Sequence, residues 1–216
     1  MDRDVAFGEP RNLWLQGSAG RIEAVLRVAC PATAAALLAH PHPLHGGTLH
    51  NPVIFHADRE LHRAGLTTMR FNFRGVGSSE GRHDEGRGEV DDVASSSSWL
   101  RGIAPGLPLL LVGFSFGAWC SIRHAIRGDG VAGVVAIGLA VRRYPFTEVQ
   151  QLARPIAVVQ GSEDEFGTPE EVRPLLESAN PEGRLYVVDG ASHLFPGQVR
   201  EAATRVVEAA RFVLQQ

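Results

Sequence analysis

The chain has 216 residues, of which 44% are apolar and 21% charged, and these proportions predict one globular domain over residues 1–216. Its 21 basic and 24 acidic residues give a net charge of -3, and no block of basic residues stands out, so nucleic-acid binding and membrane-surface binding find no electrostatic support. The longest apolar stretches, such as Leu107–Phe114, are far too short to span a bilayer.

The two cysteines and the N-terminal residues indicate the cellular compartment in which the protein is expected. Cys30 and Cys120 do not form a Cys-x-x-Cys or zinc-like spacing, so both are expected to be small core residues in a reducing environment. Residues 1–10 mix acidic and basic side chains and lack the cationic stretch and apolar run of a secretory signal. We therefore expect a cytoplasmic protein, and no pattern specifies its oligomeric state.

Short apolar runs alternate with helix-like stretches along the chain. The first run, Arg21–Ala29, places Ile22, Ala24, Leu26 and Val28 on one face, which is the period of a half-buried strand, and the sheet is expected to begin there. The other predicted strands are Ala34–Ala39, Thr67–Phe73, Pro108–Val112, Val131–Leu139, Pro155–Gln160 and Arg184–Val188. This alternation predicts an α/β fold with a mostly parallel sheet and helices on both faces.

Two helix starts are marked chemically. Asn51 before Pro52 combines a capping side chain with a first-turn proline, and Thr168 with Glu171 matches a capping box. The last helix is expected from about Gln198 and carries one apolar stripe that would dock on the sheet. The stripe consists of Val199, Ala203, Val206, Ala210 and Val213.

Two further stretches are less regular. A helix over residues 90–100 is expected to be weak, because its serine run at 95–98 has poor helix propensity. The stretch from Leu139 to Pro155 has room for about one helix. We therefore expect no cap domain or lid at that position.

A strand running directly into a Gly-x-Ser-x-Gly motif, at residues 113–117, carries the strongest chemical signal. A serine at such a sharp strand-to-helix turn is held above the sheet, and the glycines let the two backbones pass closely. Ser115 is therefore the candidate nucleophile, expected in a turn with strained backbone angles. The motif alone leaves open an ordinary glycine-rich turn.

A serine nucleophile needs a base, and the base needs a third group to hold it. In this architecture the order is serine, acid, histidine, with each residue following a strand. His193 follows the last predicted strand and is the expected base, its alternative being a loop histidine that caps the final helix. Glu163, Asp164 and Glu165 follow the preceding strand, and we select Asp164 because it stands at the third position after Gly161.

A tetrahedral intermediate requires two preorganised hydrogen-bond donors. The first is expected to be the backbone N–H of Phe116, next to the nucleophile, and the second to lie in the loop at residues 40–47. The two prolines of that loop have no N–H, which leaves His40, His42 and Leu44 among its first five residues. We select His42.

The same loop permits a metal interpretation. His40, His42 and His45 have the His-x-His-x-x-His spacing of metallo-β-lactamase-like enzymes, in which imidazoles bind zinc. Leu44 occupies the position of the usual aspartate, and no second set of histidines and acids is evident. A metal would also leave the serine, aspartate and histidine series unexplained, so no metal is expected.

A glycine-rich loop at residues 74–81 follows the strand that ends at Phe73. A dinucleotide fingerprint would need glycine where Glu80 stands, so no nucleotide cofactor is expected, and the loop is interpreted as a tight turn forming one pocket wall. The tryptophans, Trp14, Trp99 and Trp119, are expected to pack in the core or the pocket.

Together these motifs resemble the small cap-less α/β hydrolases related to the dienelactone-hydrolase branch. The resemblance covers nearly the whole chain and rests on residues 40–47, 70–81, 113–117, 161–164 and 192–195. It implies an eight-stranded type of sheet, no cofactor, and hydrolysis of carboxylic esters through an acyl-enzyme. Dienelactone hydrolases carry cysteine where Ser115 stands, which argues against that particular lactone as the substrate.

The sequence therefore predicts a serine hydrolase for esters of small or medium acyl groups. Its triad would be Ser115, Asp164 and His193, its oxyanion donors Phe116 and His42, and its partner a small-molecule ester. Long-chain lipid esters are not expected. A catalytically silent hydrolase fold used for binding, and an acyltransferase or peptidase with the same triad, are the alternatives.

Overall fold

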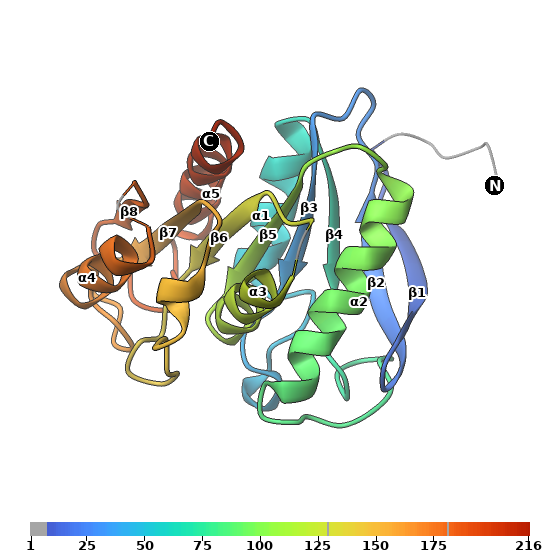
Figure 1. Ribbon diagram of the computed structural model, residues 1–216, viewed down its shortest axis with the longest axis horizontal. Helices are drawn as coiled ribbons and strands as arrows, with labels where there is room; N and C mark the ends of the chain where they lie inside the picture. Colours follow the sequence, from blue (N-terminus) through green and yellow to red (C-terminus); the bar gives the residue numbers. More distant parts are fainter. Residues whose placement is uncertain (1–7, 129, 181) are drawn as a thin grey trace.

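An eight-stranded sheet forms the centre of the computed structural model, which describes residues 8–128, 130–180 and 182–216 (Figure 1). In space the strands lie in the order β1-β2-β4-β3-β5-β6-β7-β8. Their bounds are β1 Arg11–Gly17, β2 Gly20–Arg27, β3 Ala34–Ala39, β4 Leu66–Phe71, β5 Leu109–Phe114, β6 Gly133–Ile137, β7 Ile156–Gly161 and β8 Arg184–Val188. The chain therefore has the mostly parallel sheet that its sequence predicts.

The pairing pattern explains which strands are easy to recognise in the sequence. The pairs β1·β2 and β2·β4 are antiparallel, and the other neighbouring strands are parallel. Every residue of β3, β5 and β7 is buried, because helices cover both faces of the parallel part of the sheet. Such strands are continuous apolar runs, and their carboxyl ends meet at one edge of the sheet.

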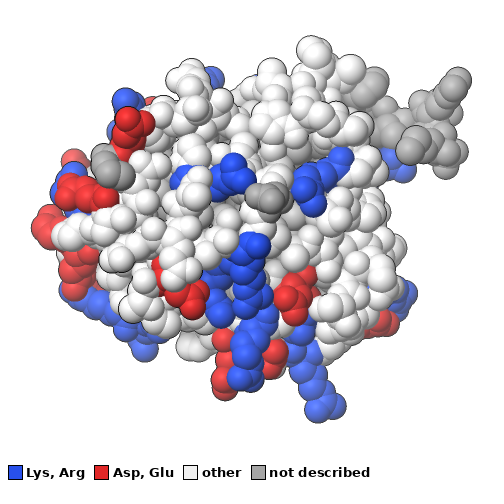
Figure 2. All heavy atoms as spheres, in the orientation of Figure 1, with Lys and Arg blue, Asp and Glu red and all other residues white. Residues whose placement is uncertain are grey.

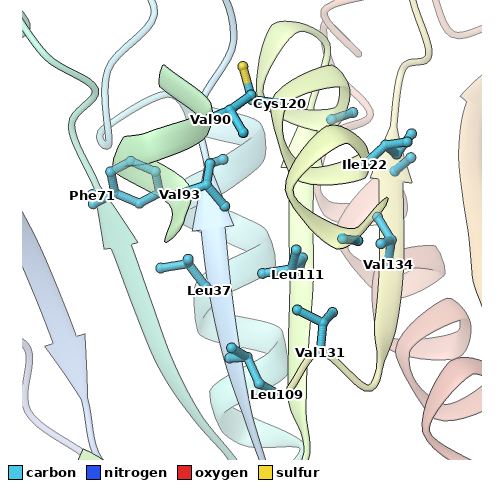
Figure 3. Packing of buried hydrophobic residues seen from close by; sticks show 14 of the residues in the cluster. Leu37, Phe71, Val90, Val93, Leu109, Leu111, Cys120, Ile122, Val131 and Val134 are labelled. Carbon is cyan, nitrogen blue, oxygen red and sulfur yellow. The ribbon is translucent and has the colours of Figure 1, made fainter. Parts of the chain in front are cut away.

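In the part of the chain that the structure describes, five α-helices cover the two faces of the sheet (Figure 1). Helices α1 and α5 pack on one face, and α2, α3 and α4 pack on the other. Figure 3 shows Val93 of α2 above Leu37 of β3, and Ile122 of α3 above Val134 of β6. The helix bounds are α1 Pro52–Arg63, α2 Arg87–Ile103, α3 Phe116–Arg127, α4 Pro169–Ala179 and α5 Val199–Leu214.

The predicted helix caps are confirmed. The Asn51 side chain accepts hydrogen bonds from the backbone N–H groups of Val53 and Ile54. At the start of α4, the Thr168 N–H donates to Glu171 Oε2 over 2.9 Å. The stripe of α5 also packs as predicted, with Ala203, Val206, Ala210 and Val213 buried and Val199 partly buried.

Three sequence predictions about local structure are wrong. The sheet begins at β1, before Arg21, and Trp14 on this edge strand has 55% of its surface exposed instead of packing in the core or pocket. Helix α2 is not weak, since it spans 17 residues. Its Ser96 and Ser97 are buried, and packing against the sheet outweighs the low helix propensity of serine.

Two connections also differ from expectation. Cys120 is buried, but Cys30 lies exposed in the turn after β2, so only one of the two cysteines is a core residue. Between β6 and β7 there is no α-helix but a short 3-10 turn, η2 Val149–Gln151. The connection therefore provides neither a cap nor a lid over the carboxyl edge of the sheet.

The surface carries charges of both signs. On the face shown in Figure 2, arginine and acidic side chains are interspersed among uncharged residues, so neither sign covers this face alone. Within the described ranges, no helix combines the length and apolar character needed to cross a bilayer.

Candidate active site

Ser115 lies in a strained turn between β5 and α3, as the sequence predicts. Its backbone angles are φ 54° and ψ -113°, a conformation that non-glycine residues rarely adopt. A Cβ atom at Gly113 would lie 2.5 Å from the Ala118 Cα, and one at Gly117 would overlap the Ala39 carbonyl group. The two glycines therefore permit the close approach of strand and helix that holds the serine in this turn.

The structure brings Ser115, His193 and Asp164 together in one hydrogen-bonded line. His193 Nε2 lies 2.9 Å from Ser115 Oγ, and His193 Nδ1 lies 2.8 Å from Asp164 Oδ2. All three residues are largely buried, although they come from three separate loops that follow β5, β7 and β8. With the carboxylate accepting from Nδ1–H, Nε2 is left free to accept a proton from the serine hydroxyl.

The Asp164 carboxylate has further donors besides the imidazole. Its Oδ2 accepts from Gln160 Nε2 over 2.8 Å, and its Oδ1 accepts from the Phe166 N–H over 2.9 Å. A buried carboxylate with three hydrogen bonds is held in one orientation. Asp164 is therefore placed and oriented to support His193.

The two neighbouring glutamates have different surroundings from Asp164. Glu163 is exposed and its carboxylate faces solvent. Glu165 accepts a hydrogen bond from the backbone N–H of His193 over 3.0 Å. Partial burial would raise the pKa of Glu165, but the hydrogen bonds from backbone N–H groups outweigh it and hold the pKa below its ordinary value. Glu165 thus fixes the backbone of the histidine loop, whereas Asp164 contacts its imidazole.

Both residues selected as oxyanion donors lie beside Ser115. Phe116 is the first residue of α3, where backbone N–H groups have no carbonyl partner within the helix. His42 starts the short turn η1 Pro43–His45, and its carbonyl accepts from the N–H groups of His45 and Gly47, each over 3.1 Å. These two bonds fix the loop that carries His42, which lines the same cavity as Ser115.

Of the three histidines in this loop, His42 and His45 contact each other with ring centroids 4.6 Å apart, whereas both ring nitrogens of His40 bind backbone groups. His40 is buried, donates from Nδ1 to the Pro41 carbonyl over 2.7 Å and accepts at Nε2 from the Phe73 N–H over 3.1 Å. Burial lowers the pKa of His40 to about 4, although its hydrogen bond to Pro41 opposes the shift. His42 Nδ1 accepts from the Leu44 N–H. Among the described residues, no three His, Cys, Asp or Glu side chains are grouped so as to hold a metal ion.

A cavity of about 630 Å³ opens above the serine. Its floor contains Ser115 and His193, and Tyr144 and Phe166 form part of its wall. Tyr144 stacks on Trp119 with ring centroids 5.1 Å apart, and burial raises its pKa to about 12, so the phenol stays neutral. The cavity is lined by Pro41, His42, His45, Gly46, Gly47, Asn51, Ser115, Arg143, Tyr144, Glu165, Phe166, His193 and Leu194.

The prediction that the loop at residues 74–81 forms a pocket wall is wrong. That loop is absent from the cavity lining and instead binds the antiparallel edge of the sheet. Ser79 Oγ accepts from the Glu23 N–H, and the Arg21 N–H donates to the Glu80 carboxylate. Its glycines therefore serve a tight turn that is anchored on β2.

Sequence reasoning missed several residues around the site. Gln160, Glu165 and Phe166 contact the triad, and Arg143 and Tyr144 line the cavity. A glutamine in an otherwise apolar buried strand was the available signal for Gln160. Arg143 and Tyr144 carried no recognisable signal, because they lie in an irregular connection after β6.

The comparisons with known proteins agree with this architecture. Residues 32–215 match the family described as an alpha/beta hydrolase domain, and the chain belongs to that family. An uncharacterized protein of Rickettsia prowazekii is 32% identical over 199 residues, which cover 88% of this chain and 84% of that protein.

Solved structures extend the comparison. An α/β serine hydrolase without a lid from Xanthomonas campestris is 32% identical, has a TM-score of 0.85 and is matched over 94% of each chain. An alpha-beta serine hydrolase homologue from Coxiella burnetii is 34% identical, with a TM-score of 0.86 over 94% of this chain and 98% of that chain. A dienelactone hydrolase from Anabaena variabilis shares the fold at 20% identity and a TM-score of 0.80, over 94% and 97%. The chain is thus a cap-less α/β hydrolase.

Proposed function

We propose that the protein is a serine hydrolase that cleaves carboxylic esters of small or medium acyl groups through an acyl-enzyme on Ser115. The observation that carries this proposal is the line of hydrogen bonds from Asp164 through His193 to the Ser115 hydroxyl, at the floor of a cavity. Serine hydroxyls are weak nucleophiles near neutral pH, and a base held in this way removes that obstacle. The family membership and the lidless serine hydrolase of X. campestris support the same chemistry.

Acylation would use the groups in fixed roles. Ser115 Oγ attacks the ester carbonyl carbon while His193 Nε2 takes the hydroxyl proton, and Asp164 stabilises the resulting imidazolium. The negative charge on the carbonyl oxygen is received by the backbone N–H groups of Phe116 and His42. When the tetrahedral intermediate collapses, its bond to the alkoxy oxygen breaks and His193 gives its proton to that oxygen. The alcohol leaves, and the acyl group stays on Ser115.

Deacylation repeats these steps with water as the nucleophile. His193 takes a proton from water as the water oxygen attacks the acyl carbon, and the same two N–H groups bind the oxyanion. Collapse breaks the bond to Ser115 Oγ, which recovers its proton from His193. The products are the carboxylic acid and the regenerated enzyme, so no cofactor is consumed.

The dimensions and walls of the cavity favour compact esters. A volume of about 630 Å³ is within the range of sites for small ligands, on the order of 300–1,000 Å³. Tyr144, Phe166 and Leu194 give apolar contact surface for an acyl or alcohol group. Because no lid lies between β6 and β7, no additional apolar surface covers a long acyl chain.

The proposal is tested by labelling and turnover together. The purified protein is treated with a fluorophosphonate probe and assayed on p-nitrophenyl esters of graded acyl length, with Ser115→Ala as the matched control. We expect labelling of wild type only, and the highest kcat/KM on short or medium acyl chains. A folded wild-type protein that is neither labelled nor active would indicate a silent binding protein. Labelling without ester turnover would favour acyl transfer or peptide hydrolysis.

A further inference from the structure

Gln160 is a polar residue in an apolar environment. It is fully buried in β7, and its strand neighbours Ile156, Ala157, Val158 and Val159 are apolar and buried as well. A glutamine side chain loses rotational freedom and hydration on burial, so an apolar residue of similar volume would satisfy packing at lower cost. The amide is therefore expected to have a role beyond filling space.

The hydrogen bonds of Gln160 fix the orientation of its amide group. Its Oε1 accepts from the Leu139 N–H over 2.8 Å, so Nε2 must face the other way. Nε2 donates to Asp164 Oδ2 over 2.8 Å and to the Gly167 carbonyl over 2.6 Å. A primary amide nitrogen has two hydrogens, and each has an acceptor here. In a flipped amide, the nitrogen would face the Leu139 N–H and the oxygen would face Asp164 Oδ2 and the Gly167 carbonyl, so all three hydrogen bonds would be lost.

This arrangement places two donors on one carboxylate oxygen. Asp164 Oδ2 receives the Nε2–H of Gln160 and the Nδ1–H of His193, each over 2.8 Å. The donor from Gln160 arises from β7, a fully buried strand that is paired with β6 and β8. This donor therefore restrains the acid loop so that one particular oxygen of Asp164, Oδ2, faces the imidazole of His193.

The same side chain ties together backbone segments on two sides of the site. Leu139 leads from β6 toward Arg143 and Tyr144 of the cavity wall, and Gly167 closes the acid loop before α4. Through one amide, Gln160 links the cavity wall, the acid loop and the triad carboxylate.

We propose that Gln160 is the positioning residue of the triad acid: by donating to Asp164 Oδ2, it holds that oxygen against His193. This inference rests on the proposed hydrolase function. Gln160 does not contact substrate, so its removal acts on the chemical step and leaves substrate binding in place.

The first test is Gln160→Leu, assayed on p-nitrophenyl butyrate. Leucine has a similar size and provides no hydrogen bond, so kcat is expected to fall by about 10- to 100-fold while KM changes by less than about threefold. Rates are expressed per site that reacts with the fluorophosphonate probe, which removes any contribution from unfolded protein. Gln151→Leu is the matched control, because Gln151 is an exposed glutamine of η2 outside the cavity lining.

The second test, Gln160→Glu, keeps shape and replaces the donor by a titratable oxygen. One carboxylate oxygen still accepts from the Leu139 N–H, and the other faces Asp164 Oδ2. Two carboxylates this close repel each other when both are ionised, so the pair shares a proton at low pH. That proton can replace the Nε2 hydrogen that Gln160 donates to Asp164, and it is lost as the pH rises. We expect the ratio of variant to wild-type kcat to fall by about tenfold or more between pH 5.5 and pH 9.

The other groups that face His193 and the cavity are present in both proteins. They are Asp164, Glu165, Arg143, Tyr144, His42 and His45. A carboxylate at position 160 that acted on them only through its charge would stabilise the protonated imidazole and lower turnover most at low pH, so the ratio would rise with pH. A glutamine with a purely structural role would therefore give a ratio that is flat or rises with pH, opposite to the fall expected here.

The outcomes separate this inference from the proposed function. If wild type hydrolyses esters through Ser115 but Gln160→Leu keeps full kcat per labelled site, the positioning role is wrong and the hydrolase stands. A ratio for Gln160→Glu that is flat or rises with pH leads to the same conclusion, even where Gln160→Leu does not fold. If wild type itself shows no labelling and no turnover, the proposed function has failed first.

Discussion

Two buried aspartates, Asp164 and Asp58, lie in hydrogen-bond networks of opposite character. Asp164 accepts from Gln160, His193 and Phe166, and the line continues through His193 to the Ser115 hydroxyl in the cavity. We call this network open, because it ends at a side chain that lines the cavity instead of at another group of the protein. A substrate that enters the cavity meets the last member of the line directly.

Asp58 of α1 belongs to a closed network. Its carboxylate pairs with Arg27 Nε over 3.0 Å and with Arg70 Nε over 3.1 Å, and it accepts from the Thr68 hydroxyl. Arg70 also donates to the Leu49 carbonyl over 2.7 Å, and burial lowers the pKa of Arg70 while Asp58 opposes that shift. These hydrogen bonds all end on groups within the protein, and none of the residues named here lines the cavity.

The comparison shows that a buried carboxylate is not by itself a sign of catalysis. Both aspartates are almost fully inaccessible and both have charged or ionisable partners. The difference lies in where the network ends: at a hydroxyl facing a cavity, or at the backbone of the fold. Loss of the first should lower turnover, and loss of the second should lower stability.

The largest expected effect comes from the open end of the first network. Ser115→Ala and His193→Ala should each lower kcat by about 10⁴- to 10⁶-fold, and the double variant should be little worse than either, because the two residues act as one unit. Melting temperatures should change little. Steady-state kinetics with calorimetry on the same samples checks both, and near-full turnover by Ser115→Ala would sink the mechanism.

A somewhat smaller loss is expected from Asp164→Asn. The substitution keeps the size of the side chain but removes the charge that orients and stabilises His193, so kcat should fall by about 10³- to 10⁴-fold. Glu163→Gln should leave kcat unchanged, and Glu165→Gln should stay within about tenfold, since its amide oxygen still accepts the His193 N–H. Should either control cripple the enzyme while Asp164→Asn barely slows it, the acid has been misassigned.

The closed network should respond in stability instead. Asp58→Asn leaves the buried guanidinium of Arg70 without its counter-charge, so the free energy of unfolding should drop by about 3–5 kcal/mol. Measured well below the melting temperature, kcat should stay within about threefold. Glu60→Gln on the same helix breaks only a surface pair with Arg63 and should change stability by less than about 0.5 kcal/mol. A large kcat loss in Asp58→Asn would remove the distinction between the networks.

The smallest of these effects concerns His40, in the loop that follows β3. Both of its ring nitrogens bind backbone groups of the protein, so it belongs to a closed network, as Asp58 does. Its folded pKa of about 4 is below the unfolded value of 6.5, so the unfolded chain binds more protons between these pH values and stability falls as pH drops from 6.5 toward 4. This group should account for about 3 kcal/mol of that loss. Urea titrations of wild type and His40→Gln over this range should show a flatter profile for the variant. Parallel profiles would contradict the assignment.

The parallel core and the three triad positions were predictable from the sequence for physical reasons. Strands buried on both faces have few alternatives to continuous apolar runs, as in Ala34–Ala39. The turn at Ser115 requires glycines at fixed spacing. Asp164 and His193 follow such strands, and the shared edge of a parallel sheet then brings them together.

The features missed by sequence reasoning depend on contacts that periodicity does not encode. Strand β1 is an antiparallel edge with a mixture of exposed and buried residues, and Trp14 is exposed on it. Ser96 and Ser97 are buried where propensity favours exposure, because the packing of α2 decides their environment. Gln160 and Glu165 act through hydrogen bonds to residues that only the folded loops bring near.

The position of β8 has a consequence for how activity is acquired during refolding. Among the described strands, β8 pairs with β7 alone, at the end of the sheet, and it delivers His193 to a serine 78 positions earlier in the chain. His193 can meet Ser115 only after β5, β6, β7 and β8 have paired side by side, because β8 reaches β5 only through these neighbours. A refolding chain can therefore regain most of its circular dichroism while still inert. Hydrolytic turnover followed in real time would therefore report when this last strand docks.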